Sequence, residues 1–551
     1  MIKKNIVKAI LFTLLFAGGL LSQTAIYDSG GPLLPQQAFY DVKFYDIAVK
    51  VNPADSTIIG NVSIYANIVQ PLDWFVLDLD TVYNITSLTT KDREGDFYSP
   101  RFERRLGKIW INMSGIRQPG KKVVLNIKYN GRPRIAPKPP WDGGFTWAKT
   151  ADGFPWIATT CQLNGADVWW PCKDYPSDEA DSVALHFTVP EPLVVASNGK
   201  LMSIVVNNDK TRTYNWFVST PINNYGISLN AAPFKTISKK YVSVAGDTLN
   251  ATFWVLPEHY DKGVKIFPQF LQHLRFYEET LGPYPFRADK YGIVETPHKG
   301  MEHQTIIAYG NEFKQGKYGF DELHQHELGH EWWGNLVTAY DWKDFWLHEG
   351  FCAYMQPLYA EKLGGEKEYH KYMNEIRGKV KNAHAVAPEE SKSIQQLYQD
   401  GDIYVKGSWI LHTLRNYVGD KDFFTMLRRM AYPDPAMEKV TDGRQCRFAT
   451  TDDFIRIANK YSGMDLKWFF DVYVRQPKLP ELKSGMVGNK LELSWETPND
   501  LPFFLPVDVK VGDKIIRVEM KKGKGDIEIP DGTKYEIDPD KNILMKEENA
   551  E

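Results

Sequence analysis

The residues best suited to chemistry form the run His326-Glu327-Leu328-Gly329-His330, with Glu349 nineteen residues after its end. On an α-helix of about 3.6 residues per turn, the two histidines lie on one face, one turn apart. Two imidazoles so placed can bind one metal ion, and a glutamate from a following helix can supply a third ligand. Two His and one Glu leave a fourth tetrahedral position open, which is typical of catalytic zinc. The spacing therefore predicts one Zn²⁺ per chain, held by His326, His330 and Glu349, with Glu327 beside the metal-bound water as general base.

The alternative is a surface helix whose histidines and glutamates are only solvated. The stretch from His330 to Thr338 reads HEWWGNLVT, which is too apolar and aromatic for a solvated face. Glu349 also falls inside an apolar run, WLHEG over 346–350. These surroundings favour the metal site. Apolar periodicity predicts helices over 262–281, 321–336, 347–363 and 404–418.

The runs HELGHEWWGNLVT and WLHEG together resemble the M1 family of zinc aminopeptidases. The family pattern is HExxH, eighteen further residues and a Glu, and this chain matches it. The family's usual WLNEG reads WLHEG here, with His348 in place of Asn; that position precedes a ligand and is not one. The resemblance implies an enzyme that removes N-terminal residues from peptides with a free N-terminus.

A second motif resembles the family's GxMEN, which lies upstream of the zinc helix. This chain has Gly300-Met301-Glu302-His303 in that place, with His303 where the family has Asn. The resemblance implies that these four residues bind substrate and that Glu302 holds the free α-amine. A buried carboxylate facing an ammonium favours chain ends, because a mid-chain amide would leave it unpaired.

Two more residues enter through the resemblance. Gln162 stands before a segment ending in Pro171-Cys172-Lys173-Asp174-Tyr175-Pro176, and it matches a polar position near the substrate amine in the family. Tyr404 begins Tyr-Val-Lys-Gly, which resembles the family's YxKG. In the family this tyrosine points its phenol at the scissile carbonyl. A neutral phenol can donate a hydrogen bond to the oxyanion, so Tyr404 is expected to stabilise it.

Composition and the N-terminal residues indicate the protein's cellular location and limit its classes of partner. The chain has 551 residues and a net charge of -3, which gives no indication of nucleic-acid or anionic-membrane binding. Residues 1–22 read as a secretory signal, because three lysines precede an apolar run over 9–21 that is too short to span a bilayer comfortably. We expect cleavage near Ser22–Gln23, an exported protein in the periplasm or outside the cell, and no stable membrane span afterwards. The alternative is an uncleaved anchor. Oligomeric state stays open, as does pairing between Cys161 and Cys172.

The coarse pattern predicts a multidomain α+β protein. Alternating Val123, Leu125, Ile127 and Tyr129 are typical of the strands expected through the N-terminal half. The resemblance implies a saddle-like antiparallel β domain and a thermolysin-like, mainly helical catalytic domain. The chain is expected to depart from the family's longer members in lacking their large helical C-terminal domain. A β-sandwich is expected last, from alternation at 491–495 and 507–511. The predicted segments are a signal peptide (1–22), the β domain (23–235), the catalytic domain (236–477) and the β-sandwich (478–545).

Two other functions compete with the aminopeptidase. A catalytically silent relative would bind peptides without cutting them, but such a protein has no chemical need for all three ligands together with Glu327 and Tyr404. A zinc hydrolase of another bond, or an endopeptidase, would have no need for the amine-binding Glu302.

Overall fold

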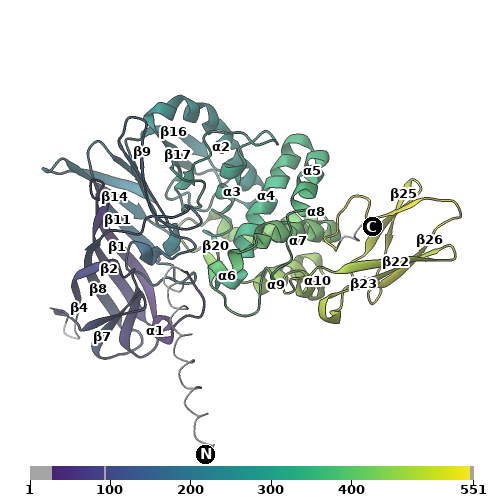
Figure 1. The fold of residues 1–551 in the computed structure, drawn as a ribbon, viewed down its shortest axis with the longest axis horizontal. Helices are drawn as coiled ribbons and strands as arrows, with labels where there is room; N and C mark the ends of the chain where they lie inside the picture. Colours follow the sequence, from purple (N-terminus) through teal and green to yellow (C-terminus); the bar gives the residue numbers. More distant parts are fainter. Residues whose placement is uncertain (1–27, 92–94, 547–551) are drawn as a thin grey trace, which may run out of the picture.

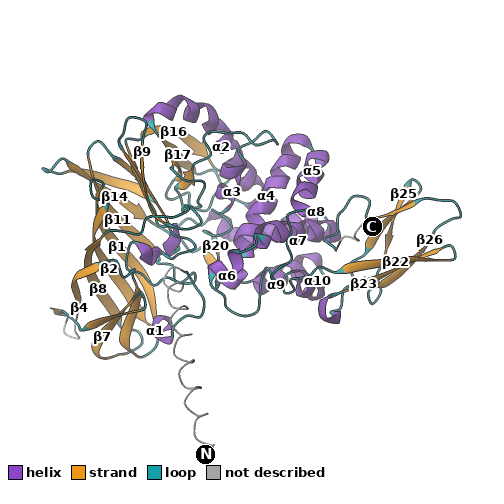
Figure 2. Cartoon of the chain, in the orientation of Figure 1, coloured by secondary structure: helices purple, strands orange, loops and turns teal. Residues whose placement is uncertain are grey.

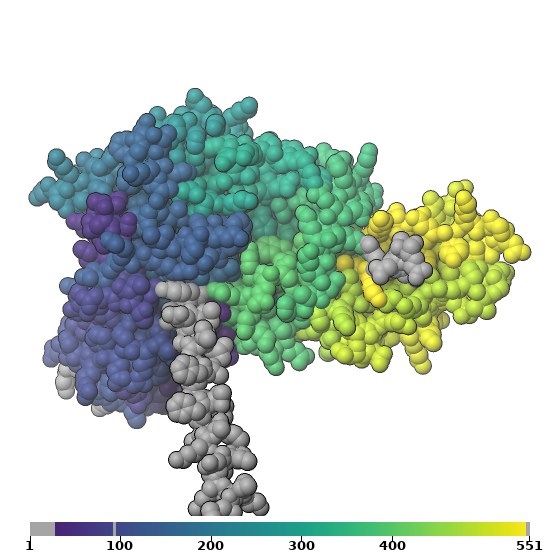
Figure 3. Space-filling view, viewed as in Figure 1, coloured from purple at the N-terminus to yellow at the C-terminus, as the bar shows by residue number. Residues whose placement is uncertain are grey.

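The computed structural model describes residues 28–91 and 95–546, and its three regions follow one another along the chain (Figure 1). Strands of the N-terminal half lie at one end, helices occupy the middle, and the last strands project at the other end. The space-filling view shows the same succession (Figure 3). The predicted signal peptide, residues 1–22, lies outside the described residues. None of the described helices is both long and apolar enough to cross a membrane.

An eight-stranded sheet is the largest sheet of the N-terminal half. Buried and exposed residues alternate along its longest strands, as the alternation in sequence predicts. In spatial order its strands are β13 (Lys200–Val206), β14 (Thr211–Val218), β11 (Ser182–Pro190), β1 (Tyr40–Asn52), β2 (Thr57–Ile68), β8 (Lys122–Gly131), β4 (Asn84–Lys91) and β5 (Phe97–Tyr98).

This sheet is mixed, which corrects the prediction of an antiparallel domain. Strands β1 and β11 pair in parallel, with Phe44 opposite Ser182 and Lys50 opposite Thr188. A parallel pair needs a long crossover rather than a hairpin. Although β1 and β11 are neighbours in the sheet, most of the other strands of this half lie between them in the sequence. Such a connection leaves no local pattern in the sequence.

Two smaller sheets complete this half. One joins β3 (Leu72–Asp78), β7 (Lys108–Arg117) and β6 (Phe102–Arg105). The other joins β12 (Val194–Ser197), β15 (Leu229–Ala232), β10 (Pro155–Thr160) and β9 (Gly144–Lys149). The second sheet positions the site, because Gln162 follows the end of β10 and Trp141 precedes β9. A short helix, α1 (Pro35–Ala38), precedes β1.

The central region opens with a sheet rather than with helices. Its strands are β16 (Lys235–Val242), β17 (Thr248–Val255), β18 (Tyr291–Glu295) and β19 (Ile307–Tyr309), and α2 (Tyr260–Leu281) connects β17 to β18. The connection from β18 to β19 carries Gly300 to His303. The predicted boundary at 235/236 falls at the first residue of β16 and stays a prediction.

Helices fill the rest of the central region (Figure 2). They are α3 (Glu322–Gly329), α4 (Trp346–Gly364), α5 (Glu366–Arg377), α6 (Ile394–Tyr398), α7 (Asp402–Val418), α8 (Asp420–Ala431), α9 (Thr451–Ser462) and α10 (Lys467–Tyr473). The helices predicted over 262–281, 347–363 and 404–418 are confirmed as α2, α4 and α7. A two-stranded parallel pair, β20 (Val337–Ala339) with β21 (Arg447–Ala449), lies among them.

The helix predicted over 321–336 is wrong in its second half, because α3 ends at Gly329. The chain then turns tightly: the Asn335 N–H donates to the His330 carbonyl, and Gly334 adopts φ 138°, a conformation that favours glycine. Strand β20 follows directly at Val337. The apolar residues after His330 are buried. Closely spaced buried residues in a turn give the same apolar pattern as a buried helix, so periodicity alone did not distinguish the two.

The last strands form two three-stranded antiparallel sheets. One contains β22 (Glu481–Val487), β23 (Lys490–Glu496) and β26 (Lys524–Glu528), and the other contains β25 (Lys514–Val518), β24 (Val507–Val511) and β27 (Tyr535–Ile537). The alternating residues that predicted these strands include Leu491, Leu493, Val507 and Val509, all buried.

Candidate active site

Helices α3 and α4 bring the predicted metal ligands together. The ligand atoms of His326, His330 and Glu349 all lie within 4.8 Å of one another. Glu349 Oε2 is 3.3 Å from His326 Nε2 and 3.4 Å from His330 Nε2, and the two imidazole nitrogens are 3.3 Å apart. Three ligands on a tetrahedral ion at about 2.0–2.1 Å would be about 3.3 Å apart. The donor set and its spacing therefore fit Zn²⁺.

The local sequence explains why α3 holds its histidines in place. The Asp321 side chain caps the helix by accepting a bond from the His324 N–H at 3.0 Å. A Cβ on Gly329 would lie 2.5 Å from the Tyr277 hydroxyl and 3.0 Å from the Cys352 sulfur, so only glycine allows this close packing on α2 and α4. His330 Nδ1 donates to the Trp333 carbonyl at 2.9 Å, which leaves Nε2 for the metal.

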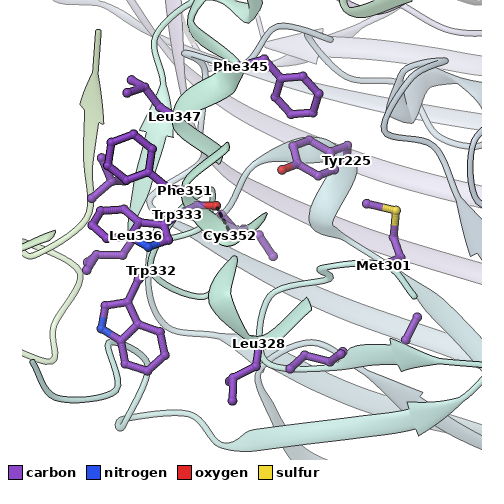
Figure 4. Packing of buried hydrophobic residues seen from close by; sticks show 14 of the residues in the cluster. Tyr225, Met301, Leu328, Trp332, Trp333, Leu336, Phe345, Leu347, Phe351 and Cys352 are labelled. Carbon is purple, nitrogen blue, oxygen red and sulfur yellow. Dashed lines mark hydrogen bonds between the residues drawn. The ribbon is translucent and has the colours of Figure 1, made fainter. Parts of the chain in front are cut away.

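Apolar side chains support the turn after α3 from behind. Figure 4 shows Trp333, Leu336 and Phe351 packed together, with Leu328 and Trp332 nearby. The Trp333 and Phe351 ring centroids are 5.0 Å apart. This packing links the turn that carries His330 to the helix that carries Glu349, so it fixes the ligands relative to each other.

Glu327 lies among other carboxylates in the same site. It is buried, and its surroundings raise its pKa well above the usual range, first through burial and then through the neighbouring Glu302. A Cβ on Gly300 would overlap the Glu327 carboxylate, so the absence of a side chain there makes room for it. A carboxylate of raised basicity is suited to accept a proton.

Gln162, from the N-terminal half, contacts Glu302, from the central region. The Gln162 Nε2 donates a hydrogen bond to Glu302 Oε1. Glu302 is 3% exposed, and burial raises its pKa to about 7. Gln162 therefore orients the carboxylate.

Two tyrosines close the site on the side of α6 and α7. The Tyr404 ring stacks on His326, with centroids 5.9 Å apart. Burial, with the nearby Glu349 carboxylate, raises the Tyr404 pKa well above its usual value, so the phenol keeps its proton. Tyr398 lies beside it at a centroid distance of 5.9 Å. Nothing in the sequence marks Tyr398 as a site residue except that it lies six residues before Tyr404.

These residues line one cavity of about 200 Å³. Its lining brings together nine of the ten predicted site residues: Gln162, Gly300, Met301, Glu302, His326, Glu327, His330, Glu349 and Tyr404. Five further lining residues were not predicted: Pro140, Trp141, Lys299, Leu323 and Tyr398. A larger surface hollow of about 700 Å³ lies between α5 and the last strands, and no predicted site residue lines it.

His303 is the predicted substrate-binding residue that this cavity does not include. Gly300, Met301 and Glu302 line the cavity, and His303, the next residue, does not. His303 is buried, and burial lowers its pKa to about 3. A neutral His303 outside the cavity cannot compete with a substrate ammonium.

Replacing His303 with Asn, the family residue, is expected to leave the pH dependence of amine selectivity unchanged near pH 6.5, the ordinary pKa of histidine. The measurement is kcat/KM for free and acetylated substrates between about pH 5.5 and 7.5. A selectivity step near 6.5 in the wild type that disappears in His303→Asn would contradict a neutral His303.

His348 replaces a family Asn without entering the metal site. Its Nε2 accepts a hydrogen bond from the Ala339 N–H at 2.8 Å. Burial lowers its pKa to about 3, so it is neutral and able to accept. His348 thus connects α4 to β20 through this hydrogen bond.

All four cysteines are free, so Cys161 and Cys172 do not form a disulfide.

The chain matches two family models. "Peptidase family M1 domain" covers residues 271–473, and "Peptidase M1 N-terminal domain" covers residues 42–225. Among curated relatives, "Probable aminopeptidase 2" of Sulfurisphaera tokodaii is 24% identical over 83% of this chain and 61% of its own length. "Aminopeptidase M1" of Arabidopsis thaliana is 22% identical over 90% of this chain and 58% of its own length. The chain thus spans about three-fifths of each.

Solved structures show the same fold. A crystal structure of an M1 zinc metallopeptidase variant from Deinococcus radiodurans, bound to a Tyr-Ser-Ala substrate, aligns with a TM-score of 0.66 at 23% identity. The alignment covers 82% of this chain and 98% of that one. Because the two family models together match well over half of its residues, the protein belongs to peptidase family M1.

Proposed function

We propose that this protein is a zinc-dependent aminopeptidase that removes single residues from the free N-termini of peptides. One observation carries the proposal: a single cavity contains both the ligand triad and the buried carboxylate of Glu302. The triad supports hydrolysis, and Glu302 supports selection of chain ends. The names of the curated relatives agree with this activity.

The chemistry divides among the protein's own residues. Bound to His326, His330 and Glu349, Zn²⁺ would supply a Lewis acid and lower the pKa of a bound water. Glu327 accepts the proton of the attacking water and passes it to the leaving amine, which its raised pKa favours. Tyr404 donates its phenolic hydrogen to the oxyanion that develops on the scissile carbonyl.

Glu302 fixes the register of cleavage. Glu302 lines the cavity and is oriented by Gln162, so a substrate ammonium can pair with its carboxylate. Pairing there places the first peptide bond, and no later one, at the metal ligands. This positioning converts a general hydrolase into an exopeptidase.

Tyr404→Phe is expected to lower kcat by roughly 10²–10³, the usual cost of losing one oxyanion donor, with a smaller effect on KM. Steady-state kinetics on an aminoacyl anilide measures both constants. Tyr417→Phe is the matched control, because Tyr417 lies on the same helix and does not line the cavity. An unchanged kcat in Tyr404→Phe would remove Tyr404 from the mechanism.

Glu302→Ala is expected to erase most of the preference for a free amine by weakening the free-amine substrate. Losing one partner of a buried charge pair costs about 2–5 kcal/mol. Gln162→Ala should have a smaller effect, because it removes a hydrogen bond that orients Glu302 and no charge. The measurement is the ratio of kcat/KM for free and acetylated substrates in each variant. A wild-type ratio in Glu302→Ala would refute the role.

The proposed function is tested with aminoacyl p-nitroanilides and the zinc-loaded protein. Cleavage that is lost on chelation and restored by Zn²⁺ is the expected result. Absence of cleavage with full zinc content would instead favour a silent peptide-binding relative. Cleavage restricted to blocked or internal peptide bonds would favour an endopeptidase.

We further propose that the chain is exported, on the signal-like pattern of residues 1–22. We also propose that the last two sheets form a β-sandwich domain near 478–545. Burial of Leu491 and Leu493 from one sheet, and of Val507 and Val509 from the other, supports that arrangement.

A further inference from the structure

The mouth of the active-site cavity carries a positive charge that the proposed mechanism does not use. Lys299 lines the cavity, and among the described lining residues it is the only Lys or Arg. Its ammonium lies 5.8 Å from the ring centroid of Trp141, which also lines the cavity and is 37% exposed. Lys138 places a second ammonium 5.5 Å from the same ring. The Trp141 ring thus makes cation–π contacts with two ammonium groups at the rim of the cavity.

Neither ammonium is neutralised by a neighbour. Within residues 28–91 and 95–546, the charge contacts of Lys138 and Lys299 are with the Trp141 ring and not with a carboxylate. Both lysines are exposed, whereas the acidic groups of the cavity are buried. The cavity therefore has its acidic groups Glu302 and Glu327 inside and its positive charge at the rim.

The position of Lys299 relates it to one part of the substrate. Its neighbour Gly300 lies against Glu327, the residue that protonates the leaving amine in the proposed mechanism. Lys299 is the next residue along the chain and lines the same cavity, in which the cleaved bond would lie beside Glu327. One residue spans at most about 3.3–3.6 Å, so a carboxylate one or two residues beyond that bond falls within reach of a long, flexible lysine.

We propose that Lys299, resting on Trp141, determines specificity by pairing with a carboxylate that closely follows the cleaved bond. The substrate class is short peptides, whose terminal carboxylate lies one or two residues beyond that bond. This inference rests on the proposed aminopeptidase function and adds a preference that Glu302 alone does not give. Because the rim is exposed to water, the effect is moderate and weakens as salt rises.

The test compares Leu-Ala with Leu-Ala-amide, which share the amine and the cleaved bond and differ in the terminal charge. Zinc-loaded wild type is expected to favour the acid roughly three- to fivefold in kcat/KM, equivalent to about 0.7–1 kcal/mol. Lys299→Gln should bring the ratio close to one, and Lys299→Arg should keep it. Lys138→Gln is the matched control: it contacts the same ring without lining the cavity and should keep the wild-type ratio.

Each outcome decides something different. Equal cleavage of acid and amide by wild type would overturn the Lys299 inference while leaving the aminopeptidase intact. A preference that survives in Lys299→Gln would also overturn it, since another group would then hold the carboxylate. Cleavage of neither dipeptide by zinc-loaded wild type would overturn the proposed function itself.

Discussion

Glu327→Gln is expected to reduce kcat by roughly 10²–10⁴ while leaving zinc bound, because an amide has the size of the carboxylate but cannot accept a proton. The carboxylate is buried beside Glu302, which raises its basicity and so suits it to the role. Metal analysis and kcat on the same preparation separate loss of chemistry from loss of metal.

Glu322→Gln is the matched control for this variant. Glu322 lies in the first turn of the same helix, is only partly buried, and does not line the cavity. It should retain wild-type kcat. A wild-type kcat in zinc-loaded Glu327→Gln would refute the general-base role, whatever the control does.

His326→Ala, His330→Ala and Glu349→Ala are each expected to lose zinc, and activity with it. The three donor atoms are mutually 3.3–3.4 Å apart, so removing any one leaves two protein ligands for the ion. Metal content after dialysis should fall from about one zinc per chain to near zero. The rise in melting temperature that zinc confers on wild type should disappear as well, since a ligand stabilises only the state that binds it.

His370→Ala is the control for the histidine variants, because His370 lies on α5, away from the cavity. It should keep zinc and activity. Full zinc occupancy in all three ligand variants would refute the assignment.

The metal ligands could be predicted from sequence because each lies in a locally encoded element. His326 lies within α3, and His330 caps the end of that helix one turn later. Glu349 lies in the first turn of α4. Spacing alone then indicates the ligand set. Tyr404 and Glu302 could be proposed only through resemblance, since neither residue carries a local signal of its own.

What the sequence did not predict depends on contacts between distant segments. Trp141 and Lys299 reach the cavity from different halves of the chain, and nothing in their neighbourhoods marks them. The neutral state of His303 follows from burial that its tetrapeptide does not reveal. The parallel pairing of β1 with β11 and the early end of α3 are likewise set by tertiary structure.

The most direct test of an amine-anchored zinc peptidase is kcat/KM for one aminoacyl anilide and its N-acetylated form, measured on zinc-loaded wild type. Acetylation removes the ammonium and leaves the buried Glu302 facing a neutral group. At about 2–5 kcal/mol for a lost buried partner, the acetylated substrate should be cleaved at least roughly 30-fold less efficiently. Equal kcat/KM for the two substrates would contradict the account, because Glu302 would then not be selecting a free N-terminus.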